Sequence, residues 1–80
     1  MESKAAIIAI IIEKPDSVKN FNEILHEYAQ YIIGRMGIPY PKKNINIISI
    51  AVDAPTSIID TLAEKIRGLD GINARTVYST

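Results

Sequence analysis

The chain has 80 residues, and its nine basic residues balance nine acidic ones, so that the formal net charge is zero. Balanced charge argues against the broad basic surface with which nucleic-acid-binding proteins hold a polyanion. The absence of cysteine excludes disulfides, thiolate metal sites and thiol nucleophiles. Because a domain of this size leaves much of its surface in water, we expect self-association to supply part of its stability.

The first predicted element is the apolar run from Ala5 to Ile12, which is far too short to span a membrane. Isoleucine has a stiff side chain that suits a pleated strand, and Pro15 ends the run because proline cannot extend a ladder. Both alternating sets of side chains are apolar, which predicts a central strand covered on both sides. We interpret the run as a strand and not as a signal sequence, and expect a cytoplasmic protein without membrane contact.

A helix is predicted next, capped by Asp16 or Ser17 and ending near Tyr31. Its apolar stripe recurs at three- and four-residue steps. The stripe consists of Val18, Phe21, Leu25, Tyr28, Ala29 and Ile32. The stretch from Ile32 to Ile38 loses this period, contains two glycines and is followed by two prolines, which predicts a short strand and then a loop.

The second half of the chain repeats the alternation of strand and helix. Ile45 to Val52 is the third predicted strand, and a second helix begins at Thr56 or Ser57. Its inward stripe is Ile59, Leu62, Ala63 and Ile66. Gly68 is expected to take the left-handed conformation just past the helix, and Gly71 to turn the chain into a last strand, Ile72 to Tyr78.

The order β-α-β-β-α-β is typical of an α+β ferredoxin-like sandwich, in which a four-stranded antiparallel sheet carries both helices on one face. We therefore expect a single domain over residues 1–80. The other face of its two central strands would be apolar and uncovered, which a soluble monomer rarely tolerates. We predict a homodimer or homotetramer that packs through this face. The predicted interface residues are Ile7, Ala9, Ile11, Ile47, Ser49 and Ala51.

Gly34-Arg35-Met36-Gly37 matches the GxxG sequence pattern of the loop with which KH modules clamp nucleic acid. That loop joins two helices, whereas Pro39 and Pro41 prevent a helix from following Gly37. The two central strands also lack the aromatic residues with which an RNA-recognition motif stacks bases. We therefore expect no direct binding of nucleic acid.

No catalytic constellation is recognisable in the chain. The loop Glu13 to Ser17 lacks the glycines and arginine of an acylphosphatase-like anion cradle, and no serine or threonine has a triad partner. His26 could bind a metal with Glu23, which is one helical turn away, or less favourably with the adjacent Glu27, but an exposed helix histidine is the preferred interpretation. We expect no enzyme activity, no cofactor and no metal site.

A small effector or a partner protein has one candidate contact region. Tyr40 stands between two prolines and has basic neighbours that could meet an anionic group. The candidate contact residues are Arg35, Tyr40, Lys42 and Lys43.

Several short motifs occur in order along the chain. They are Leu25-His26-Glu27, Ile38-Pro39-Tyr40-Pro41 with Asn44, Gly68-Leu69-Asp70-Gly71-Ile72 and Arg75-Thr76-Val77. This set resembles the ACT-like family of iron-only hydrogenase system regulators over essentially the whole chain. The resemblance implies a regulatory module that self-associates and is related in fold to the C-terminal domain of nickel-responsive regulators. The histidines and cysteine with which those regulators bind nickel are missing from Met36 to Ile45.

Two functions remain open. In the first, an ACT-like domain regulates the hydrogenase system, including its transcription, by oligomerising and by binding a small effector at a subunit boundary. The alternative is an interaction or assembly module that binds no ligand. An effector that binds the native oligomer would raise its melting temperature with concentration, which distinguishes the two.

Overall fold

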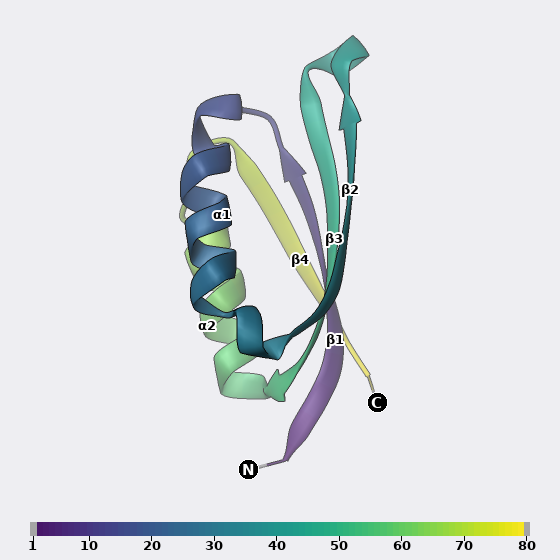
Figure 1. The fold of residues 1–80 in the computed structure, drawn as a ribbon, viewed down its shortest axis with the longest axis vertical. Coiled ribbons are helices and arrows are strands. Elements are labelled where there is room, and N and C mark those ends of the chain that lie inside the picture. Colours follow the sequence, from purple (N-terminus) through teal and green to yellow (C-terminus); the bar gives the residue numbers. More distant parts are fainter. Residues whose placement is uncertain (1, 80) are drawn as a thin grey trace.

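The fold is a four-stranded antiparallel sheet with two helices on one face, as the computed structural model of the chain shows for residues 2–79 (Figure 1). Its helices and strands are β1 (Ser3–Ile12), α1 (Val18–Glu27), β2 (Ile32–Tyr40), β3 (Ile45–Pro55), α2 (Thr56–Arg67) and β4 (Ile72–Tyr78). The strand order is β2-β3-β1-β4, which makes β2 and β4 the two edges. The predicted α+β ferredoxin-like arrangement is confirmed.

The core lies between the sheet and the helices and follows from strict alternation along the strands. Along β1, every even-numbered residue from Ala6 to Ile12 is buried, and Ile48, Ile50 and Val52 of β3 lie beside them. The helices contribute Phe21, Leu25, Ile59, Leu62, Ala63 and Ile66 to the same cluster. The predicted central position of β1 is confirmed, and its odd-numbered residues are exposed in the single chain, so that only another chain could cover that side.

Several predicted boundaries differ from those of the structure. Helix α1 ends at Glu27, and a separate 3-10 turn, Ala29–Tyr31, leads into β2. Strand β2 continues to Tyr40 because an edge strand tolerates Pro39, whose missing N–H need not point to a neighbouring strand. Gly68 is right-handed, with φ of −72°. The left-handed glycine is Gly71, with φ of +72°.

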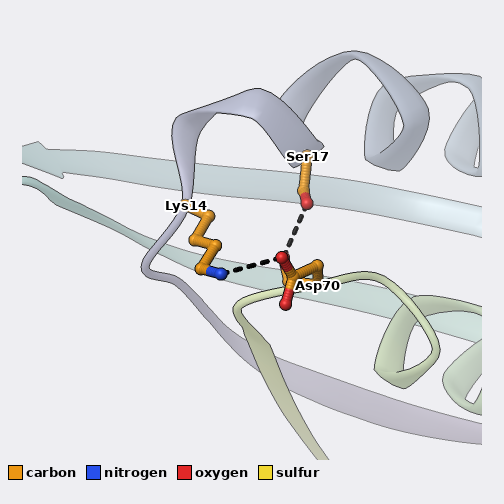
Figure 2. A network of polar contacts seen from close by, with 3 residues as sticks. All are labelled: Lys14, Ser17 and Asp70. Carbon is orange, nitrogen blue, oxygen red and sulfur yellow. Dashed lines mark hydrogen bonds and ion pairs between the residues drawn. The ribbon is translucent and has the colours of Figure 1, made fainter.

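A polar clasp joins the loop before α1 to the loop after α2 (Figure 2). The Lys14 Nζ lies 2.8 Å from the Asp70 carboxylate, and this hydrogen bond, followed by the Asp70 charge, raises the pKa of the lysine. The Ser17 hydroxyl donates to the Asp70 carbonyl oxygen at 2.6 Å. Ser17 precedes α1 as predicted, but its side chain bonds the opposite loop and forms no helix cap.

Candidate functional site

The candidate site is the face of the sheet that lies away from the helices, here called the open face. It carries the odd-numbered residues of β1, β3 and β4 and, from residue 34 onward, the even-numbered residues of β2. Ile33 also belongs to it, because it lines a hollow with Ile7 and Val77. All the large hydrophobic side chains that stand out as exposed in residues 2–79 belong to it. They are Ile7, Ile11, Ile33, Met36, Ile38, Tyr40, Ile47 and Val77. In Figure 1 both helices lie to the left of the sheet, and the open face is directed to the right.

The strand register determines which side chains lie next to one another on the open face. One row across the sheet is Met36, Ser49, Ala9 and Arg75, and the next is Ile38, Ile47, Ile11 and Asn73. The small side chains of Ala9 and Ser49 therefore form a shallow trough beside a ridge of isoleucines. The structure thus brings the six predicted interface residues onto one surface.

Sequence reasoning missed the contribution of β2 to this surface. Ile32 is opposite Val52 and Gly34 is opposite Ala51, so Ile33 is an extra, bulged residue. After this bulge, the alternation places Met36 on the open face, where its side chain is 64% exposed. The bulge also borders an apolar hollow of about 300 Å³ beside β1 and β4.

Polar groups of the open face lie mainly at its rim. Arg75 is on the edge strand β4, and Asp53 is exposed near the end of β3. The Asn73 side-chain amide donates to the Glu13 carboxylate at 3.0 Å. An apolar centre surrounded by a polar rim is typical of a protein–protein interface.

The four candidate effector contacts do not form one cluster. Arg35 points to the helix side of β2, where its guanidinium donates to the Asn22 side-chain oxygen at 3.2 Å. The Arg35 Cζ also lies 5.8 Å from the ring centre of the buried Phe21. Tyr40 is on the open face, whereas Lys42 and Lys43 lie in the turn that follows β2.

His26 and the Gly34–Gly37 motif, the other candidate features of the sequence, lie on an exposed helix surface and within strand β2. His26 is exposed on α1. Across residues 2–79, no three histidine, aspartate or glutamate side chains gather as metal ligands would. The Gly34–Gly37 motif lies within strand β2 and not between helices. No helix in the described part of the chain has the length and apolarity that a membrane span requires.

A polar contact joins the edge strand β4 to helix α2. The Tyr78 hydroxyl donates to the Asp60 carboxylate of α2. This hydrogen bond raises the pKa of Tyr78 above its usual 10.0, and burial and the Asp60 charge act in the same direction. The contact keeps the Asp60 carboxylate engaged within the chain.

Replacing Asp60 with asparagine should lower the pKa of Tyr78, because the amide carries no charge that opposes phenolate formation. The phenol is the donor, and its native pKa is raised. The stabilisation is therefore complete below pH 10.0 and is lost as the pH rises through the native pKa. Tyrosinate absorbance during an alkaline titration measures the shift, with Tyr78→Phe identifying the affected group. Superimposable titration curves for the native and Asp60→Asn proteins would contradict the assignment.

Comparison with known proteins identifies a family. The sequence profile of the TM1266-like family, described as "Iron-only hydrogenase system regulator, putative", matches residues 4–76. The structure of uncharacterised protein TM1266 from Thermotoga maritima superimposes with a TM-score of 0.94 and 25% identity, covering 99% of this chain and all of that one. Among curated proteins, none matches the chain.

Two more distant structures share the fold alone. A formyltetrahydrofolate deformylase from Pseudomonas putida KT2440 has a TM-score of 0.65 at 13% identity, over 91% of this chain and 28% of its own. A protein of unknown function from Galdieria sulphuraria has a TM-score of 0.66 at 11% identity, over 99% of this chain and 46% of its own. In both, the matching region is less than half of a larger chain.

Proposed function

Because the chain belongs to the TM1266-like family of iron-only hydrogenase system regulators, we propose that it is a non-catalytic regulatory protein that acts by self-association through the open face. The observation that carries this proposal is the gathering of the exposed large hydrophobic side chains on that one face. Burial of apolar surface contributes about 25 cal/mol per Å², and no element within residues 2–79 covers this face. The open face of a second copy would cover it.

The amount and shape of exposed surface support a second copy as the partner. The chain exposes 5251 Å², whereas a compact monomer of its mass exposes about 4,800 Å². The isoleucine ridge around Ile11 and Ile47 borders the trough at Ala9 and Ser49, so one surface carries both a raised and a recessed region. Two copies of one such surface can pack ridge against trough, as stacked sheets do.

The regulatory action is proposed to require the assembled protein. We assign no part in it to a small effector, because the four candidate contact residues lie on different surfaces of β2 and its following turn. Transcription would be affected only through a DNA-binding partner, since the fold contains no helix-turn-helix arrangement in residues 2–79. A ligand-free assembly module, the alternative, would use the same face.

Replacing Ala9 with lysine should convert the native oligomer to a monomer. The new ammonium group would lie in the middle of the apolar trough, where its burial without a counter-charge costs several kcal/mol. Ser49→Lys should act in the same way, because Ser49 is directly opposite Ala9. Size-exclusion chromatography with light scattering measures the mass, and circular dichroism checks that each variant is folded.

The matched control is Asn20→Lys, which adds the same charge on the exposed side of α1. It should leave the mass of the oligomer unchanged. A native protein that stays monomeric at high concentration, or an Ala9→Lys variant of native mass, would refute the proposed interface. In the host cell, control of iron-only hydrogenase activity should be lost with Ala9→Lys and kept with Asn20→Lys.

A further inference from the structure

The outer edge of β4 carries main-chain N–H and C=O groups that form no hydrogen bond with β1. The Glu13 N–H donates to the Gly71 oxygen at 2.7 Å and the Ser79 N–H to the Ala5 oxygen at 2.9 Å, at the two ends of the β1·β4 ladder. Hydrogen-bonded and non-hydrogen-bonded pairs alternate along an antiparallel ladder, so the odd-numbered residues of β4 bond β1. The N–H and C=O groups of Ile72, Ala74 and Thr76 therefore point away from the sheet.

A groove follows this edge between β4 and α2. Its volume is about 610 Å³, within the range of ligand sites. It is lined by Asp60, Ala63 and Arg67 of α2 and by the consecutive residues 72–76 of β4. One wall is a run of successive strand residues, so the groove runs along the extended backbone of β4. We call it the β4 groove.

The charge of the β4 groove is positive. The ion pairs within residues 2–79 are Lys14–Asp70 and Lys65–Glu27, which leaves the guanidinium groups of Arg67 and Arg75 without a carboxylate partner there. The third ionisable group of the lining, Asp60, accepts the Tyr78 hydroxyl. Two cations are thus available to a ligand beside a free strand edge.

We propose that the β4 groove binds an acidic, extended segment of a partner protein, which adds to the sheet as a fifth strand beside β4. The outward N–H and C=O groups supply its main-chain bonds, and Arg67 and Arg75 bind its carboxylates. Strand addition between an edge strand and a helix is an established mode of peptide recognition. A second copy of this chain fits less well, because pairing β4 with β4 would bring two arginines from each copy together.

Nucleic acid is also a poorer match for this groove. Its lining has two cations and no aromatic ring for base stacking. Arg67 lies in the helix layer and Arg75 at the β4 rim of the open face, so Arg67 is the cation that distinguishes this site from the proposed self-association surface. Such a site would allow a regulator with no helix-turn-helix in residues 2–79 to bind another protein.

The test uses fluorescein-labelled octapeptides in which pairs of valines alternate with pairs of glutamates or, as a control, with pairs of lysines, so that both faces of the added strand carry charged side chains. Fluorescence anisotropy should show that the acidic peptide binds and the basic one does not. Arg67→Glu should weaken binding by about fivefold or more, through loss of one ion pair and gain of a repulsion. Lys19→Glu, on exposed α1, is the charge-matched control and should bind as the native protein does.

A proline at residue 76 tests the main-chain bonds. Thr76→Pro removes an outward N–H that β1 does not use, so the protein should fold while peptide binding falls by about tenfold or more. Amide NMR shifts on peptide addition should be largest at residues 72, 74 and 76. Equal binding of both peptides, or native affinity in Arg67→Glu and Thr76→Pro, would overturn the proposal. So would Arg67-dependent binding of an oligonucleotide or inorganic phosphate without peptide binding. Variants that lose peptide binding but keep the native oligomer mass would show that peptide binding and self-association use different sites.

Discussion

Replacing Gly71 with alanine should lower the free energy of unfolding by about 2–3 kcal/mol. Gly71 has φ of +72°, a conformation that costs a residue with a Cβ atom about 1–2 kcal/mol. The added Cβ would also lie 2.5 Å from the Lys14 Cγ and 2.7 Å from its Cβ. These atoms are close to the Lys14 backbone, so the loop itself must move. The same movement would disturb the hydrogen bond from the Glu13 N–H to the Gly71 oxygen. Urea denaturation followed by circular dichroism measures the change.

Gly68→Ala is the matched control for this prediction. Gly68 is right-handed, and a Cβ there would meet the Glu64 and Lys65 carbonyl oxygens at 3.5 Å, an ordinary contact. Alanine also reduces the freedom of the unfolded chain, so stability should be unchanged or should rise by less than about 1 kcal/mol. Equal losses in the two variants would show that the left-handed turn at Gly71 is not what requires glycine.

The same two glycines show how far the sequence predicts local structure. A glycine after a helix is a good indication of where the helix ends, and α2 does end at Arg67. It does not reveal which of two nearby glycines takes the positive φ. The glycine with the positive φ, Gly71, lies beside the clasp between Lys14, Ser17 and Asp70, which joins residues more than 50 positions apart. Contacts between distant loops leave no local pattern.

The order of strands and helices was predictable because each element has a clear period. The even-numbered residues of β1 and the stripe of α2 were correctly placed in the core. The open face was predicted from β1 and β3, but not the share of β2. Pro39 and two glycines favoured a short strand there, and the bulge at Ile33 interrupts the alternation that would have revealed Met36 and Ile38. The β4 groove depends on the packing of α2 beside an edge and could not be inferred from sequence.

Ile10→Ala should lower the free energy of unfolding by about 2–5 kcal/mol, the usual cost of a cavity in place of a buried isoleucine. Ile10 is 1% exposed and lies opposite Ile48 of β3. Its neighbour Ile11, 39% exposed on the open face, provides the comparison. In the monomer, Ile11→Ala removes only partly buried surface and should cost less than about 1 kcal/mol. Thermal unfolding across a range of protein concentrations measures both variants.

Concentration separates the two effects. Self-association stabilises the native state by mass action, so the melting temperature of the native protein should rise with concentration. Ile11→Ala weakens the proposed interface, and its deficit should therefore grow as the protein becomes more concentrated. The cavity left by Ile10→Ala is present in monomer and oligomer alike, so its deficit should be visible even at the lowest concentration. If Ile11→Ala were equally costly in dilute solution, the odd-numbered side of β1 would contribute to the monomer's own stability, and the open face would lose its assignment as an interface.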